Sequence, residues 1–148
     1  MAKSFRTNSL PFSPVPNKTA SLADDVRDYI AANLSVGMKG STLTSGAFND
    51  SNMNQVTVYD AGGAPPDKYI AVDELLVHIE VRRTAQNYIG AMWDARQIFH
   101  LLNRKFNFTF GDQDVLSCFA LSQPQNTGLD AKNRWLVTCS YIFKLRNA

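Results

Sequence analysis

One stretch of the chain, residues 73–106, constrains the fold most, because the spacing of its apolar residues changes within it. Between positions 75 and 81 apolar and polar residues alternate, which is typical of a strand with one buried face. After Thr84 the apolar residues recur every three or four positions, as on one side of an amphipathic helix. They are Ala85, Tyr88, Met92, Ala95, Phe99 and Leu102. The pattern predicts a strand followed by a long helix that Thr84 caps, with the apolar stripe packed against a sheet.

Four other segments show a regular pattern. Residues 55–60, 115–123 and 133–146 alternate like strands, and the last of these is the clearest. A first helix is expected after Ser21, a predicted cap with Asp24 three positions later, and Gly37 is its predicted stop. The order predicts an α+β fold with the elements αββαββ. We expect a mainly antiparallel sheet of about four strands, with both helices packed on one face.

The length of the chain, 148 residues, is sufficient for the core of one domain, which we expect in residues 21–148. Residues 1–20 are rich in proline and have no periodic pattern. They are interpreted either as a disordered tail or as an arm that orders on a neighbouring subunit, with Phe5, Leu10 and Phe12 as anchors. The polar segment 38–54 is long for a compact domain. It is expected to bind something, to be disordered, or to contain a short strand or turn.

The sequence contains no pattern that indicates catalysis or cofactor binding. His78 and His100 lie on different elements, without the spacing of zinc ligands. Cys118 and Cys139 fall within predicted strands, where a free cysteine behaves as a small buried apolar residue. Nucleophile motifs and phosphate-binding glycine motifs are absent from the sequence. We therefore expect no enzyme and no catalytic, metal or cofactor-binding residues.

The charge and the apolar runs of the chain bear on nucleic-acid binding and on membrane or secreted proteins. A net charge of +2 is too small to indicate nucleic-acid binding by itself. No run approaches the roughly 20 apolar residues of a membrane span, and no apolar segment of a secretory signal follows Lys3 and Arg6. A soluble protein made in the cytoplasm is the expectation.

Several charged and aromatic residues lie off the predicted apolar faces. They are Glu80, Arg82, Arg83, Trp93 and Arg96. Tryptophan and arginine are favoured in protein interfaces, so one interpretation is a contact between subunits or with a partner. The other is a solvated face, on which neighbours such as Trp93 and Arg96 pair along the helix.

Residues 58–63, VYDAGG, and the two prolines at 65 and 66 resemble the short strand and Gly-Gly turn of bacteriophage tail terminator proteins. This family is also described as minor capsid or tail completion proteins. Residues 76–82, LVHIEVR, resemble its strand that leads into a helix, and that helix is matched by Tyr88, Ala91 and residues 95–102. Residues 25–30, DVRDYI, are similar to its opening helix. The resemblance covers residues 22–106 well and the last two predicted strands by pattern alone.

The resemblance implies a structural role in the virion of a long-tailed phage. Members form a ring, usually a hexamer, on the head-proximal end of the tail, where it stops growth of the tail tube and meets the neck of the head. The implied partners are other copies of the chain, the tail tube protein and a neck or head completion protein. Phage DNA passes through the lumen without sequence-specific binding, and no membrane is involved. The implied location is the tail of the virion, which is assembled in the host cytoplasm.

Three alternatives remain open from the sequence. The nearest is another neck, head completion or tail-tube protein, and a small hydrolase without a recognisable motif is the most distant. Between them stands an accessory protein that binds nucleic acid through a patch of basic residues. That patch would contain Arg82, Arg83, Arg96, Arg104, Lys105, Lys144 and Arg146.

Overall fold

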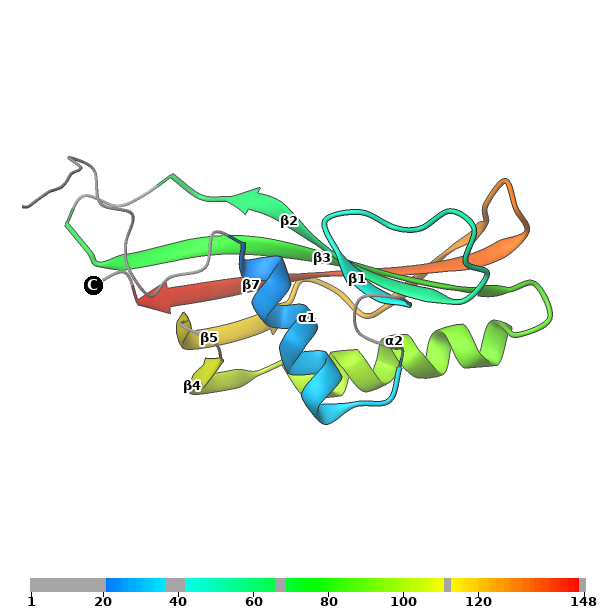
Figure 1. Ribbon diagram of the computed structural model, residues 1–148. Helices are drawn as coiled ribbons and strands as arrows, with labels where there is room; N and C mark the ends of the chain where they lie inside the picture. The colour runs from blue at the N-terminus through cyan, green and yellow to red at the C-terminus, as the bar shows by residue number, and fades with distance from the viewer. Residues whose placement is uncertain (1–20, 37–41, 66–68, 111–112, 147–148) are drawn as a thin grey trace, which may run out of the picture.

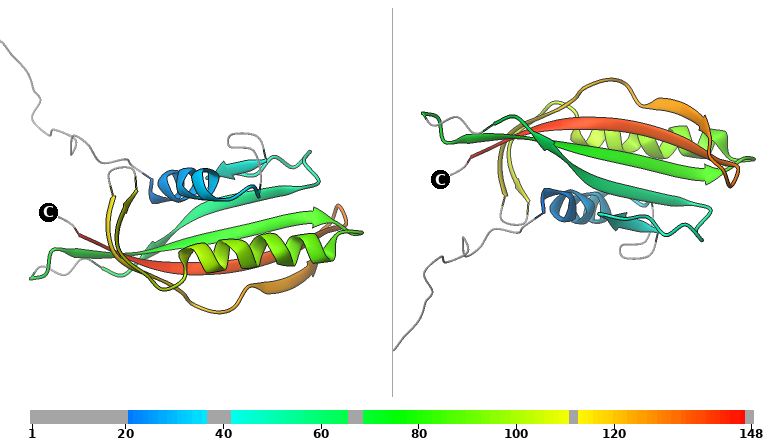
Figure 2. Two further views of the ribbon diagram at one scale, coloured as in Figure 1. Left: turned by 90° about the horizontal axis from the view of Figure 1, so that it is seen from below. Right: turned by 90° about the horizontal axis from the view of Figure 1, so that it is seen from above.

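The computed structural model describes residues 21–36, 42–65, 69–110 and 113–146 (Figure 1). One mixed sheet of seven strands forms the body of the molecule, and two helices cover one of its faces (Figures 1 and 2). The elements in chain order are α1 (Leu22–Asn33), β1 (Leu43–Ser45), β2 (Gln55–Gly63), β3 (Val72–Thr84), α2 (Tyr88–Leu102), β4 (Lys105–Phe110), β5 (Gln113–Ala120), β6 (Gln125–Leu129) and β7 (Arg134–Arg146).

Two long strands, β3 and β7, form the centre of the sheet. They pair antiparallel over their whole length, from Val72 opposite Arg146 to Thr84 opposite Arg134. The strand order is β1-β2-β3-β7-β5-β4, and β6 pairs separately with β7. Only the pair of β1 and β2 is parallel among the described strands. Because side chains alternate along a strand, β3 turns Val77 and Ile79 toward the helices and turns His78 to the opposite face.

The hydrophobic core lies between this sheet and the two helices. Its largest fully buried side chains include Ile30 of α1, Ile98 and Leu102 of α2, and Tyr141 and Phe143 of β7. The alternation in residues 133–146 therefore predicted the inward face of the last strand correctly. Cys118 and Cys139 are free and buried, as expected.

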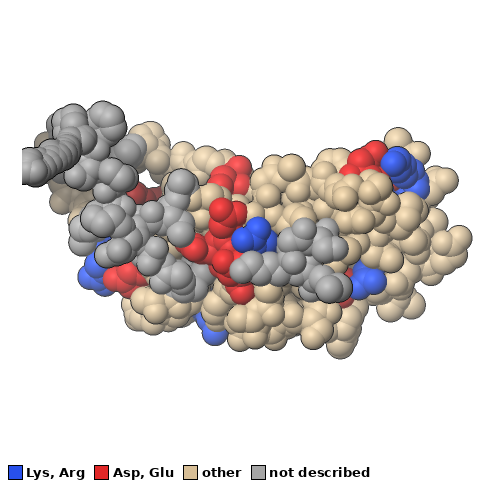
Figure 3. All heavy atoms as spheres, viewed as in Figure 1, with Lys and Arg blue, Asp and Glu red and all other residues tan. Residues whose placement is uncertain are grey.

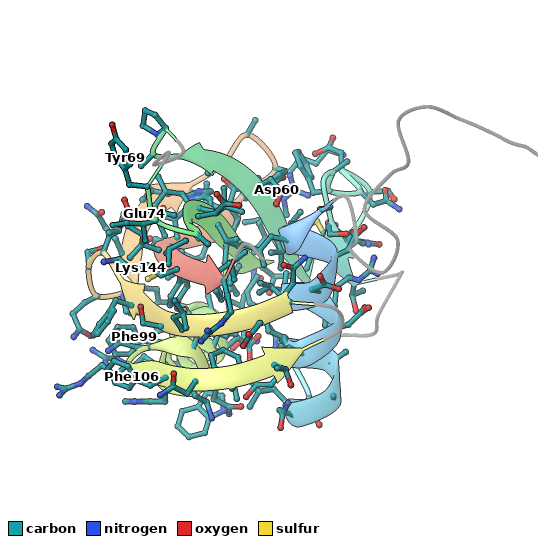
Figure 4. All side chains as sticks on the ribbon, turned by 90° about the vertical axis from the view of Figure 1, so that its left-hand side faces the viewer. Asp60, Tyr69, Glu74, Phe99, Phe106 and Lys144 are labelled. Atoms are coloured by element: carbon teal, nitrogen blue, oxygen red, sulfur yellow. The ribbon has the colours of Figure 1, made fainter. Side chains whose placement is uncertain are left out.

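The start of α1 is fixed by hydrogen bonds from two directions. The Ser21 hydroxyl accepts a hydrogen bond from the backbone N–H of Asp24 at 3.3 Å, so the predicted cap is confirmed. The Asp60 carboxylate, on β2, accepts one from the Ser21 hydroxyl at 2.6 Å and one from the backbone N–H of Ala23 at 3.0 Å. Figure 4 shows Asp60 beside the beginning of α1. A carboxylate at a helix N-terminus also interacts favourably with the helix dipole, so Asp60 attaches α1 to the sheet.

The prediction of four mainly antiparallel strands in the order αββαββ is wrong. The observed order is αβββαββββ, and the sheet is mixed. Strand β1 has three residues, too few to show alternation within the polar segment 38–54. Strand β4 is the aromatic run near residue 107, and β6 lies in a stretch of Gln, Asn, Thr and Gly that has low strand propensity. Pairing with the long β7 compensates for that low propensity.

The predicted start of the second helix is also wrong. Thr84 is the last residue of β3, and α2 is capped by Asn87, whose side chain accepts a hydrogen bond from the backbone N–H of Gly90 at 3.0 Å. The predicted apolar stripe is correct at Ala95, Phe99 and Leu102, but Tyr88 at its beginning is exposed. Residues 1–20 and Gly37, with the predictions made for them, lie outside the described residues.

Candidate assembly interface

The outer side of α2 exposes two large apolar side chains. The side chains of Ile89 and Trp93 are 81% and 63% exposed, and Arg96 and His100 continue the same line along the helix. These four residues, called the α2 stripe below, are three or four positions apart, so they share one side of the helix. The opposite side packs on β3, β5 and β7. The α2 stripe is therefore available to a partner.

The α2 stripe is cationic as well as apolar. The single acidic residue of α2 is Asp94, which turns inward and forms an ion pair with Arg83 of β3. Burial raises the pKa of the Asp94 carboxyl, and the hydrogen bonds from Arg83 only partly offset this effect. Arg96 donates a long hydrogen bond of 3.5 Å to the Gln123 side chain. The α2 stripe thus has bulky apolar groups at one end and positive charge at the other. Protein interfaces are enriched in such aromatic and arginine side chains.

The structure separates the five residues that the sequence suggested as one contact group. Trp93 and Arg96 lie together in the α2 stripe. Arg83 points to the helix side of the sheet, where its guanidinium binds Asp94. Glu80 and Arg82 lie on the opposite face of the sheet and pair with each other at 2.9 Å. The anchors proposed in residues 1–20 are outside the described residues.

A second cluster of charges lies on the face of the sheet away from the helices. Arg134 is 3% exposed, and its guanidinium donates hydrogen bonds to the carboxylates of Asp130 and Asp50 and to the backbone carbonyls of Asp50 and Asn52. Arg82 is also buried and lies 4.0 Å from the centre of the Phe48 ring. These contacts hold residues 46–54, which connect β1 and β2, against the sheet. Nothing in the spacing of the sequence indicated this cluster, because its members are distant along the chain.

The charges of this cluster favour the ionised form of its two aspartates. Hydrogen bonds from Lys132 and Arg134 lower the pKa of the Asp50 carboxyl below its usual value of 3.8. Burial raises the pKa of Asp130, but hydrogen bonds from the backbone N–H groups of Arg134 and Lys132 and from the Arg134 guanidinium outweigh burial and lower it. The cluster thus contributes stability only while both aspartates are ionised.

Acid should release residues 46–54 from the sheet. A carboxyl whose pKa is lowered by folding contributes stability above its unfolded pKa of about 3.8, and that stability is lost as the pH falls below this value. We expect faster amide hydrogen exchange in residues 46–54 at pH 3 than at pH 6, after correction for the intrinsic rate. The amides of β7 are the internal control. Equal corrected exchange at the two pH values would contradict the role of Asp50 and Asp130 as clamps.

The described residues also form a hollow on the sheet, apart from the α2 stripe and the charge cluster. This hollow of about 460 Å³, on the face away from the helices, is lined by Ala64, Pro65, Ile70, Val72, Glu74, Leu116 and Lys144. Its two charged groups, Glu74 and Lys144, are 3.9 Å apart and lie on the same side as Tyr69 in Figure 4. Among the described residues no cluster of His, Cys, Asp and Glu is suited to a metal ion. None of the described helices has the length and apolar content of a membrane span.

Comparison with known proteins agrees with this picture of a structural protein. A family model described as "Bacteriophage tail terminator protein" matches residues 29–147. No curated protein matches the chain. A chain of the solved structure "Virion of native gene transfer agent (GTA) particle" has the same fold, with a TM-score of 0.66 and 12% sequence identity over 84% of this chain and 94% of that chain. The family match extends over most of the chain, so this protein belongs to the bacteriophage tail terminator proteins, which are structural proteins of the virion.

Proposed function

We propose that the protein forms a ring, hexameric as the family resemblance implies, that caps the tail tube at its head-proximal end. The observation that carries the proposal is the family match over residues 29–147. The α2 stripe supports it, because a monomer that exposes Ile89 and Trp93 to water gains by burying them against another chain. In this role the protein has no catalytic residue and needs no cofactor.

Capping would follow from the shape of the ring. Contacts between different surfaces of successive copies close into a ring when their rotation divides a full turn. One face of such a ring would complement the last ring of the tail tube protein, and the other would offer no template for a further tube subunit. That other face would instead meet a neck or head completion protein. Phage DNA would pass through the lumen without recognition of its sequence.

Binding of nucleic acid as the main function has less support from the structure. Four of the seven basic residues suggested for it are in ion pairs within the chain: Arg82 with Glu80, Arg83 with Asp94, Lys144 with Glu74 and Arg146 with Asp114. A phosphate-binding patch would need these side chains to face the ligand. A steep fall of DNA affinity with rising salt would favour this alternative.

Two segments are proposed to adapt to neighbours in the virion. One is the arm of residues 1–20, with Phe5, Leu10 and Phe12 as anchors, and it orders only on assembly. The other is the segment 38–54, of which residues 46–54 are held by Arg134 when the chain is alone. Hydrogen exchange that is equally fast in the free protein and in assembled tails would make the arm a passive tail.

Loss of the protein should abolish control of tail length. In a phage that lacks this chain, we expect tails that vary in length and do not join heads, because nothing stops polymerisation of the tube. Electron microscopy of lysates measures the lengths, and supplying the wild-type chain from a plasmid is the control. Native mass spectrometry of the purified protein, alone and with tail tubes, tests the ring. Tails of normal length would contradict the terminator function, and a protein that is monomeric in both conditions would contradict the ring.

A further inference from the structure

A second exposed stripe, on α1, matches the α2 stripe in spacing and in chemistry. It consists of Asp24, Asp28, Ala31 and Ala32, and is called the α1 stripe below. The side chains of Asp24 and Asp28 are 50% and 46% exposed, and Ala32 is exposed as well. Asp24, Asp28 and Ala32 are four positions apart on the side of α1 that is turned away from the core residues Val26 and Ile30. Ala31, which is partly buried against the core, borders them. The α1 stripe has two carboxylates at its beginning, both of which pair with Arg27, and small apolar residues at its end.

The two stripes are complementary when the helices are antiparallel. In that arrangement Arg96 of the α2 stripe lies near Asp28, and His100 lies near Asp24. Trp93 then lies over Ala31 and Ala32, where small side chains leave room for a bulky ring. Positive charge meets negative charge along one half of the contact, and a large apolar side chain meets small ones along the other half.

Within one chain the two stripes do not meet. Helix α1 packs on β1, β2 and β4, whereas α2 packs on β3, β5 and β7. Figure 2 shows α1 and α2 on the same side of the sheet, and Figure 1 shows α1 steeply inclined to α2. Figure 3 shows acidic residues gathered in the middle of the face on which α1 lies. A second copy must therefore be rotated relative to the first for its α1 to lie along the α2 of the first in the antiparallel orientation.

We propose that the α2 stripe of one copy binds the α1 stripe of the next, with Arg96 facing Asp28 and Trp93 packed on Ala31 and Ala32. This inference rests on the proposed ring and names the surfaces that form it. The contact joins two different surfaces, so repeating it adds copies in one direction until the ring closes. Arg27 lies beside Asp28 and forms a 3.1 Å ion pair with it, so the Asp28 carboxylate is already positioned when the second copy arrives.

Exchange of the two charges tests the contact. In Arg96→Glu and in Asp28→Lys, like charges face each other, and we expect self-association to weaken by about 100-fold. In the double variant the charges are opposite again at every contact, and assembly should return to within about tenfold of the wild type. Native mass spectrometry and analytical ultracentrifugation measure the assembly, and thermal unfolding confirms that each variant folds. Lys144→Glu, a charge reversal in another exposed ion pair, is the matched control and should assemble like the wild type.

Fluorescence gives an independent measurement. Trp135 is largely enclosed and donates a hydrogen bond to the carbonyl of Ala85, so the change in emission on assembly should come from Trp93. We expect a shift to shorter wavelength as the wild type assembles, and no such shift in Arg96→Glu at the same concentration.

The outcomes separate this contact from the ring itself. A wild-type ring that both single variants also form would overturn the contact and leave the ring standing. If both single variants fold but fail to assemble, and the double variant also fails to assemble, the contact is overturned as well. A wild-type dimer that each single variant dissociates and the double variant restores would support the contact and contradict the ring. A wild type that is monomeric with and without tail tubes would overturn both.

Discussion

Replacing Arg134 by alanine should lower the free energy of unfolding by about 3 kcal/mol, because removal of one member of a buried ion pair leaves the other without compensation. The guanidinium is 3% exposed and is the link between β7 and residues 50–52. Its loss removes the guanidinium donors from the partly buried Asp130 carboxylate and from the backbone carbonyls of Asp50 and Asn52. The effect is placed at the lower end of the range for buried pairs because Asp50 remains accessible to water. Urea unfolding followed by circular dichroism measures it.

Lys132 is the matched control for Arg134. Its amine lies 2.9 Å from the same Asp50 carboxylate, but the side chain is 49% exposed. Lys132→Ala should therefore change the free energy of unfolding by no more than about 1 kcal/mol. Arg134→Lys keeps the charge and loses the planar set of donors, so we expect an intermediate loss. Equal effects of Arg134→Ala and Lys132→Ala would show that the cluster acts through charge alone and that burial contributes nothing.

Replacing Phe99 by alanine should lower the free energy of unfolding by about 3–5 kcal/mol, the usual cost of removing a large aromatic side chain from a core. Phe99 is 8% exposed and belongs to the core cluster between α2 and the sheet. The truncation leaves a cavity that β3, β5 and β7 cannot fill without moving the strands that they pair with. Thermal and urea unfolding, at concentrations below those at which copies associate, measure the loss.

Ile89→Ala provides the comparison on the same helix. Ile89 is 81% exposed, so its truncation in the free chain should change the free energy of unfolding by no more than about 0.5 kcal/mol. The same variant should weaken assembly, because Ile89 belongs to the α2 stripe. A loss below 1 kcal/mol for Phe99→Ala would mean that the core around α2 collapses into the space, and that its packing is looser than the buried fractions indicate.

The elements that could be predicted from sequence are those whose burial imposes a repeating pattern. Strands β3 and β7 each contain a long stretch in which buried and less buried residues alternate, so alternation was visible in both. Strands β1 and β6 depend on partners for their conformation. β1 is three residues long and β6 is mostly exposed, so neither has a buried face long enough to appear as a pattern. Strands β1 and β6 are thus stabilised by pairing rather than by their own apolar residues.

Surface residues could be grouped from the sequence only where they lie on the same helix or strand. Trp93 and Arg96 share one helix, so their spacing alone places them on one side. Arg82 and Arg83 are neighbours in sequence but lie on opposite faces of the sheet. Arg82 pairs with Glu80 of the same strand and with Asp130, and Arg83 pairs with Asp94, so the fold brings one acidic partner near each arginine. Charge counted along the chain therefore overstated the positive surface of the protein.

The position of β7 in the sheet has a consequence for how the chain acquires its structure. This strand comes last among the described strands, yet it pairs with β3, β5 and β6 and so occupies the middle of the sheet. Most of the contacts that hold β3 and β5 in place are therefore missing until the last strand has been synthesised. Folding must wait for a pairing between segments far apart in sequence, which is intrinsically slow. A chain that ends before β7 would expose the edges of β3 and β5, so truncated chains should be removed by aggregation or proteolysis before they can enter a ring.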